Sequence, residues 1–293
     1  IRDTDRSVGS EMCIRDRAMA VIAGTTSCDD FLDREPMSSI SPETYYSTAA
    51  QLEANLNDEY PNVLPSFGQW TYGIFGEDKG TDNQIEVNAN DRYTQDRWKV
   101  PHSESDNWKF ERIYRINFFL SEALPKFGED MSGSQNTISG SVATIKHYIG
   151  EMYFLRAYEY FKKLQLFGDF PIINQPLADE MEALREASKR FPRNEVARFI
   201  ISDLDKAYAY MSDVDMATTR INKDAAMLVK SRVALFEATW LQNFKGTAFV
   251  PGGEGWPRAS LHNNYQYPSG NLDNEVKYFL EPVSYTHLRA HET

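Results

Sequence analysis

The segment from Val142 to Phe167 reads VATIKHYIGEMYFLRAYEYFKKLQLF. Its apolar residues fall on nearly every side of a helical projection: Ile149, Met152, Phe154, Leu155, Ala157, Phe161 and Leu164. A helix that is apolar all round packs against neighbours on several sides. Gly168 suits a left-handed C-cap and Pro171 prevents continuation. The sequence therefore predicts one long, largely buried helix over 142–167.

Amphipathic helical patterns precede this segment. Ser41 is a good N-cap with Pro42 at the first helical position. The helix that begins there carries one apolar stripe, formed by Tyr45, Ala49, Leu52 and Leu56. A second helix is expected from Asp106, with inward-facing residues at Ile113, Ile116, Leu120 and Ala123. Trp108 lies in that expected helix and is predicted to be part of the core.

Three more helices are expected after Pro171. One runs from Asn194 to Met211, with Val196, Ile200, Leu204, Ala207 and Met211 on one face. Asn222 caps the next, which ends near Gly246 and places Trp240 in the core. The last begins at Asp273 and is stopped by Pro282. Only Phe170 to Asn174 is expected to form a brief strand pairing.

This pattern predicts an all-α fold. Helices joined by modest loops pack most readily as antiparallel pairs, and stacked pairs form an α-solenoid. Ala157, Phe161 and Pro171 follow the spacing of a tetratricopeptide unit, in which the small residue lets a partner helix approach. We therefore expect antiparallel helical pairs that stack on one another.

The residues from Val21 to Phe31, VIAGTTSCDDF, predict a lipoprotein signal. A short apolar run meets small residues and then Cys28, after which the chain turns acidic. Cleavage before Cys28 would leave it as a lipid-carrying N-terminus. The alternative is an ordinary apolar stretch that ends in a buried free cysteine.

Several sequence blocks together resemble SusD/RagB-type nutrient-binding lipoproteins. The blocks occur in the family's order: Cys28–Pro36 (CDDFLDREP), Ser41–Tyr46 (SPETYY), Phe154–Phe161 (FLRAYEYF), Leu166–Pro171 (LFGDFP), Ile201–Ala207 (ISDLDKA), Ile221–Ala226 (INKDAA), Ser231–Leu235 (SRVAL) and Pro251–Pro257 (PGGEGWP). The resemblance implies a helical tetratricopeptide-like superhelix with long irregular ligand-binding loops.

The resemblance also implies a function. Such a protein is anchored through Cys28 in the outer membrane and faces the cell exterior, and Asp29 and Asp30 resemble the export signal for that face. It would be a non-enzymatic binding protein that captures oligosaccharides or peptides. Its expected partner is a SusC-like TonB-dependent transporter, which would take up the ligand and supply the energy for import.

The two ends of the chain do not fit the resemblance. Residues 1–17 and 282–293 look like translated adapter sequence and are predicted to be non-native. Residues 18–28 would then be a truncated lipoprotein signal, and 29–281 the N-terminal helical domain of a longer SusD-like protein.

Composition excludes some classes of function. The 293 residues are 41% hydrophobic, which is enough for a sizeable core. The net charge of −12 argues against a nucleic-acid partner, whose phosphates it would repel. With Cys13 in the suspect leader and Cys28 lipidated, no thiol pair is left for a disulfide or a cysteine metal site.

Catalytic motifs are weak in this sequence. Gly252–Gly255 lacks the lysine and the following helix of a phosphate loop. His102, His147 and His262 are scattered, and single histidines are usually surface or core residues with ordinary partners. Asp213 and Asp215 start like a calcium loop that lacks its glycine. The sequence predicts no catalytic residue, no metal site and no cofactor.

The long polar segment from Pro65 to His102 is the predicted ligand-binding loop. A structureless segment of this length is usually functional or disordered, and its aromatic content argues against disorder. Aromatic rings stack on sugar faces, while Asp, Asn and Arg pair with hydroxyl groups. The candidate contacts are Asp82, Asn83, Arg92, Tyr93 and Trp98, although loop residues of this kind are often only solvated or anchor the loop.

Two other classes of function stay open from the sequence. One is a secreted helical enzyme that acts on glycans, because acidic residues are numerous enough to supply a catalytic pair. The other is an intracellular helical-repeat adaptor, in which Cys28 would be a plain thiol.

Overall fold

The computed structural model describes residues 45–65, 107–128, 130–212 and 219–292, with side chains as far as residue 284. The chain divides into two compact units, Ile1–Tyr45 and Tyr46–Thr293, and the helices described below belong to the second. In the described part of the chain, seven helices and no strands are present: α4 (Ala49–Val63), α5 (Glu111–Phe127), α6 (Val142–Phe167), α7 (Met181–Ala187), α8 (Arg193–Tyr210), α9 (Lys223–Asn243) and α10 (Leu272–Glu292). The predicted all-α class is confirmed.

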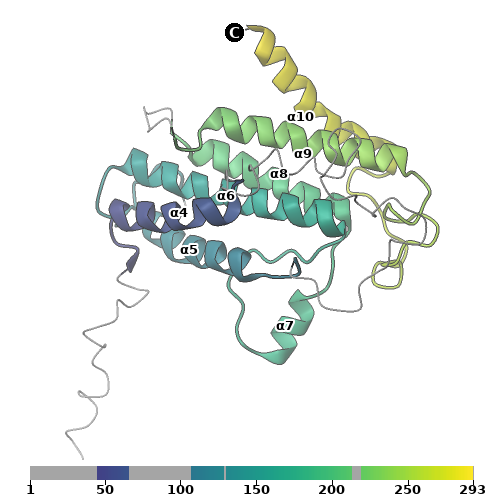
Figure 1. Cartoon of the computed structure of the whole chain (residues 1–293), viewed down its shortest axis with the longest axis horizontal. Helices are drawn as coiled ribbons and strands as arrows, with labels where there is room; N and C mark the ends of the chain where they lie inside the picture. The colour runs from purple at the N-terminus through teal and green to yellow at the C-terminus, as the bar shows by residue number, and fades with distance from the viewer. Residues whose placement is uncertain (1–44, 66–106, 129, 213–218, 293) are drawn as a thin grey trace, which may run out of the picture. The chain divides into compact units, whose positions relative to one another are not determined.

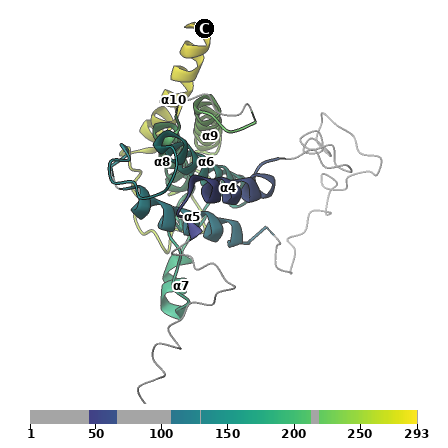
Figure 2. The same cartoon turned by 90° about the vertical axis from the view of Figure 1, so that its left-hand side faces the viewer.

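Helix α6 is the centre of this unit. It packs against α4, α5 and α8, while α8 packs on α9 and α9 on α10 (Figure 1). Figure 2 views several of these helices end-on and shows the same neighbours. Apart from α7, each helix from α5 onward thus lies against the next helix along the chain. Contacts between successive helices are typical of stacked helical pairs, which confirms the predicted architecture.

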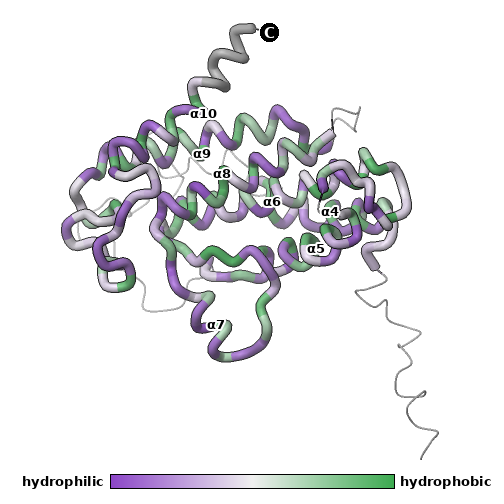
Figure 3. Tube along the Cα trace, turned by 180° about the vertical axis from the view of Figure 1, so that it is seen from behind, coloured by the Kyte–Doolittle hydropathy of each residue, from purple (hydrophilic) through white to green (hydrophobic). Residues whose placement is uncertain are grey.

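Helix α6 has the bounds that its sequence predicts. The seven apolar residues on which the prediction rests are all buried, with Ile149, Met152, Leu155 and Ala157 fully inaccessible. Figure 3 shows apolar residues recurring between polar ones along the surrounding helices. Gly150 lets α8 come close, because a Cβ atom there would lie 2.9 Å from the carbonyl oxygen of Ala207. A glycine in α6 therefore permits close packing of α6 on α8.

A buried ion pair joins α6 to α8. Arg156 donates through Nε and Nη2 to the two carboxylate oxygens of Asp203, at 2.6 and 2.8 Å. Its Nη1 donates to Asn117 of α5 at 2.9 Å and to the carbonyl oxygen of Asn174 at 3.1 Å. Both charged side chains are almost completely buried. A paired, hydrogen-bonded guanidinium thus links three helices and the loop after α6.

A second buried carboxylate joins α8 to α10. Glu275 accepts hydrogen bonds from Arg198 at 2.6 and 2.8 Å, from Asn194 at 3.0 Å and from the backbone N–H of Ser269 at 3.1 Å. Burial acts to raise the pKa of Glu275, but the hydrogen bonds from Arg198, Asn194 and Ser269 outweigh it and lower the pKa. The ionised carboxylate therefore stabilises the position of α10.

The described residues test the predicted start of the second helix and not that of the first. Helix α4 begins at Ala49, where Thr48 and Gln51 form a capping box at 48–51. Ser41 and Pro42 lie outside the described residues. Helix α5 begins at Glu111 and not at Asp106. The residues before it are held outside the helix by Trp108 and Phe110, whose rings pack on Phe170.

Two further differences concern α7 and α10. No helix is predicted where α7 lies; it is a short helix with no buried residue that stands apart from the others in Figures 1 and 2. The prediction that Pro282 stops the last helix is wrong, because α10 continues through Pro282 to Glu292. A proline removes its own N–H, but a helix can continue past it at the cost of that hydrogen bond. The brief pairing near Phe170 is present as a single antiparallel bridge to Phe191.

Candidate binding site

A pocket of about 290 Å³ lies where the end of α6, the start of α8 and the end of α9 meet the loop after α9. Its lining comes from stretches far apart in the sequence: Leu164–Asp169, Arg190, Arg193, Trp240, Ala248, Phe249 and Trp256–Arg258. The volume is at the lower limit of small-molecule pockets, which start at about 300 Å³. Four of the lining side chains are charged, namely Asp169, Arg190, Arg193 and Arg258.

Asp169 holds two walls of this pocket together. The chain leaves α6 through Gly168, whose φ of +66° suits a residue without a Cβ atom. Asp169 then accepts a hydrogen bond from the backbone N–H of Arg193 at 2.9 Å and one from Trp256 Nε1 at 2.8 Å. Burial raises the pKa of Asp169. Both carboxylate oxygens are occupied by protein donors, so this acid positions the site.

Trp240 and Phe249 supply the aromatic surface. Trp240 donates from Nε1 to the carbonyl oxygen of Phe249 at 3.0 Å, which fixes the ring at the end of α9. The prediction that Trp240 belongs to the core is wrong, because its side chain is only half-buried and lines the pocket. Phe249 is 61% exposed. The sequence pattern placed Trp240 on a helix correctly but could not show that α9 is uncovered there.

Trp108 also differs from the prediction. It precedes α5 outside any helix and is half-buried, so it is not a core residue of that helix. Its ring lies 4.9 Å from the ring of Phe167 and 5.0 Å from that of Phe170. The guanidinium of Arg190 lies 4.4 Å from the centroid of the Trp108 ring. Trp108 therefore contacts a pocket residue, Arg190, without lining the pocket itself.

The loop of the Pro251–Pro257 block shapes the remaining wall. Gly253 approaches Thr247 so closely that a Cβ atom would lie 1.9 Å from the carbonyl oxygen of Thr247. Only glycine fits there without moving the backbone. The turn buries Trp256, whose ring stacks on that of His262 at 5.7 Å, and leads to Arg258. This block was quoted for its family resemblance, and the structure shows that it builds part of the pocket.

The pocket combines the groups that bind a polar ring compound. Flat aromatic rings offer apolar surface, and the arginines offer several N–H donors. Its one carboxylate cannot form the pair of acidic groups that glycoside hydrolysis commonly uses. The arrangement suits reversible binding.

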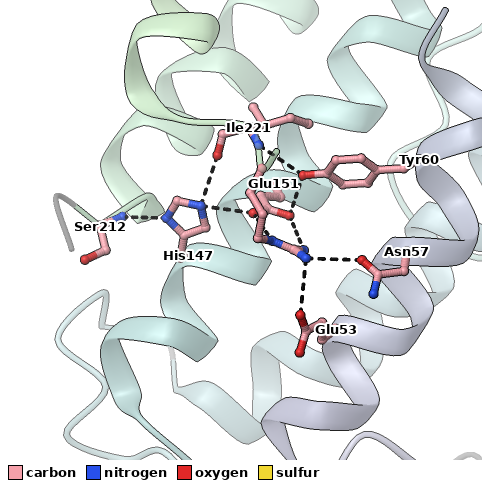
Figure 4. Close-up of polar contacts among 8 residues, drawn as sticks. Glu53, Asn57, Tyr60, His147, Glu151, Ser212 and Ile221 are labelled. Atoms are coloured by element: carbon pink, nitrogen blue, oxygen red, sulfur yellow. Dashed lines mark hydrogen bonds and ion pairs between the residues drawn. The ribbon is translucent and has the colours of Figure 1, made fainter. Parts of the chain in front are cut away.

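A second polar cluster, around His147 and Glu151, has the appearance of a catalytic dyad (Figure 4). His147 Nε2 lies 3.0 Å from Glu151 Oε1 and 3.0 Å from the carbonyl oxygen of Ile221, while Nδ1 accepts from the N–H of Ser212 at 3.2 Å. Because Nδ1 accepts, the neutral ring carries its proton on Nε2. His147 therefore has ordinary core partners, as the sequence suggested.

Glu151 is equally enclosed. It accepts hydrogen bonds from Arg220 at 2.8 and 2.6 Å and from Tyr60 at 2.8 Å. Figure 4 shows Glu53, Asn57 and Tyr60 reaching this cluster from α4. Glu151 and His147 are both buried, and neither lines the pocket described above. The cluster ties α4 and α6 to the loop before α9 and is structural.

The predicted site residues lie outside the described residues. This applies to the lipid anchor Cys28 and to the ligand-binding candidates Asp82, Asn83, Arg92, Tyr93 and Trp98. The possible calcium-loop residues 213 and 215 are also outside. Among the residues that the structure does describe, no group of three His, Cys, Asp or Glu side chains could hold a metal ion. Within the same residues, no helix has the length and apolar character needed to cross a bilayer.

Comparison with known proteins gives a family match over most of the described unit. A SusD-like family model, described as "Starch-binding associating with outer membrane", matches residues 30–235. The chain belongs to the SusD-like family. This confirms the resemblance drawn from the sequence blocks. Trp240, Phe249 and Trp256 of the pocket lie beyond the matched range.

Individual SusD-like relatives are distant. SusD-like proteins P25 and P2 of Formosa agariphila are 25% and 26% identical, over 73% and 78% of this chain. The chain covers 41% and 44% of their lengths, so it spans about two fifths of these relatives. A crystal structure of a SusD-like protein from Bacteroides fragilis matches 71% of this chain and 38% of its own, with a TM-score of 0.51 and 22% identity. That likeness supports the fold.

Proposed function

We propose that this chain binds glycans as part of a SusD-like outer-membrane lipoprotein. The observation that carries the proposal is the pocket at the end of α6, where Trp240 and Phe249 lie beside arginine donors. Aromatic surface next to fixed hydrogen-bond donors suits a sugar, which has both apolar C–H faces and hydroxyl groups. The starch-binding description of the matching family model supports the same class of ligand.

We also propose where the protein is anchored and which partner receives its ligand. Cys28 would carry the lipid anchor, and the helical domain would face the cell exterior. Captured oligosaccharides, or alternatively peptides, would be delivered to a SusC-like TonB-dependent transporter. The protein would bind and release its ligand without cleaving it. The description of the matching family model as associating with the outer membrane supports the location, and the resemblance of the sequence blocks supports the transporter as partner.

Asp82, Asn83, Arg92, Tyr93 and Trp98 remain proposed ligand contacts. Their support is the aromatic and amide-rich composition of the 65–102 segment. The pocket and this segment are two candidate ligand sites.

Calorimetric titration with oligosaccharides tests the binding step. Neutral and acidic oligosaccharides are titrated into the full chain, and the same mixtures are assayed for new reducing ends. We expect at least one oligosaccharide to bind, with no new reducing ends. Failure of every oligosaccharide to bind would contradict the glycan ligand, and new reducing ends would favour the enzyme alternative.

Metabolic labelling tests the anchor. Cells that express the protein are grown with radiolabelled palmitate, with Cys28→Ser as the matched control. We expect label in the wild type and none in the variant. An unlabelled wild-type protein would contradict the lipid anchor and favour the adaptor alternative.

A further inference from the structure

The lining of the pocket contains more positively than negatively charged side chains. Three arginines line it, and Asp169 is the one acidic lining residue. This is unusual in a chain whose net charge is −12. An excess of positive charge in a recess suggests a ligand that carries negative charge.

One of the three arginines is already neutralised. Arg193 pairs with the fully buried Glu237 behind the pocket, at 3.0 Å from Nε to Oε1 and 2.9 Å from Nη2 to Oε2. Its guanidinium also lies 4.0 Å from the centroid of the Trp240 ring. Arg193 is therefore a fixed part of the wall.

The other two, Arg190 and Arg258, have no ion-pair partner among the residues that the structure describes. Asp169 is the one acidic residue in the lining, and both of its oxygens already accept protein hydrogen bonds. Burial and then the like charge of Arg258 lower the pKa of Arg190. Both side chains are half-buried, so their donors are partly removed from water without receiving a carboxylate.

The position of Arg190 is nevertheless well defined. Its guanidinium lies over the Trp108 ring, and its backbone carbonyl oxygen lies 3.0 Å from Nε2 of His262. A guanidinium stacked on an aromatic ring keeps its N–H groups available at the edge, where they can bind two oxygens of a planar or tetrahedral anion. The stacking thus orients the donors without using them.

We infer that Arg190 and Arg258 form an anion-binding subsite of this pocket, which takes the carboxylate or sulfate group of an acidic sugar. Trp240 and Phe249 would contact the ring of that sugar while the two arginines bind its charged substituent. This inference rests on the proposed glycan-binding function and adds the class of glycan. Carboxylate and sulfate share the chemistry that matters here, because each presents two or more oxygens to a guanidinium.

The test compares matched acidic and neutral sugars. The full chain is titrated calorimetrically with a uronate oligosaccharide, with its carboxyl-reduced neutral counterpart and with a sulfated galactan oligosaccharide. Arg190→Gln and Arg258→Gln are measured alongside Arg232→Gln, which removes an exposed charge on α9 away from the pocket. Thermal melts monitored by circular dichroism show whether each variant is folded.

We expect an acidic oligosaccharide to bind more tightly than the neutral one. Each pocket variant should weaken that binding about tenfold or more, the usual scale for a charge-assisted hydrogen bond. Arg232→Gln should leave it unchanged. If the uronate oligosaccharide loses affinity in the pocket variants, the bound anion is a carboxylate. If the sulfated galactan oligosaccharide loses affinity, the bound anion is a sulfate.

Two outcomes would overturn the inference. Equal affinity for acidic and neutral sugars, unaffected by Arg190→Gln and Arg258→Gln, would refute the subsite and leave glycan binding intact. Binding of none of the three sugars would refute the subsite, and failure of the wider oligosaccharide series would then refute the proposed function as well.

Discussion

Arg156 in the helical core and Arg190 in the pocket show two uses of the same side chain. Arg156 is buried, and its donors are taken by Asp203, Asn117 and a backbone carbonyl. Arg190 is half-buried, lies over Trp108 and has no carboxylate partner among the described residues. The partners of Arg156 hold helices together, whereas the N–H donors of Arg190 are proposed to bind a ligand. Loss of charge should therefore reduce stability in the core and affinity in the pocket.

The largest effect is expected from Asp203→Ala. The variant leaves the buried Arg156 without its carboxylate, and breaking a buried ion pair costs about 3–5 kcal/mol. Asp205→Ala is the matched control, because Asp205 lies on the same helix, is 54% exposed and pairs with Lys230 at the surface. Exposed pairs contribute about 1 kcal/mol or less. Urea unfolding measures the free energy of unfolding of both variants. Similar losses in Asp203→Ala and Asp205→Ala would contradict the structural role of the core pair.

A smaller loss of stability is expected when the pH is lowered and the Glu275 carboxylate becomes protonated. Because the folded-state pKa of Glu275 is lowered below 4.5, its ionised form stabilises the protein above that pH. The contribution is lost as the pH falls below 4.5 through the lowered folded-state pKa. The free energy of unfolding of the wild type should therefore fall more steeply in this range than that of Glu275→Gln, with exposed Glu281→Gln as the control. Parallel pH profiles for wild type and Glu275→Gln would show that the hydrogen bonds do not lower this pKa.

The smallest effect on stability is expected in the pocket, from Phe249→Ala. The ring is 61% exposed, so its removal should change the free energy of unfolding by about 0.5 kcal/mol or less. Glycan affinity should nevertheless fall several-fold, because the ring is proposed to contact the sugar. Tyr114→Ala removes another exposed ring, on α5, and should leave affinity unchanged. If both variants bind equally well, Phe249 has no part in the site.

The helical scaffold was predictable from the sequence because its signals are local. The all-round apolar pattern of 142–167 and the cap at Asn222 define α6 and the start of α9 without reference to other segments. The predicted helix at Asn194–Met211 is within one residue of α8 at each end. The start of α5 was missed because rings far apart in the sequence, those of Trp108 and Phe170, pack together and keep that stretch out of the helix.

The pocket could not be predicted in the same way. Its lining comes from 164–169, 190, 193, 240, 248–249 and 256–258, which only the folded chain brings together. Arg190 and Arg258 look like ordinary surface arginines in the sequence. The glycine-rich block that ends at Trp256 and Pro257 is the one signal of the pocket in the sequence, and its family resemblance does not indicate its role in the lining. Helical periodicity predicts Trp240 in the core, because it does not show where a neighbouring helix ends.

The most direct test of the account is ¹⁹F NMR of the full chain labelled with 5-fluorotryptophan, recorded with and without a bound oligosaccharide. The chain has five tryptophans, and single Trp→Phe variants assign their resonances. If the ligand occupies the pocket, the Trp240 resonance shifts on binding. Shifts confined to Trp70 and Trp98, in the 65–102 segment, would contradict this and place the ligand at the other candidate site.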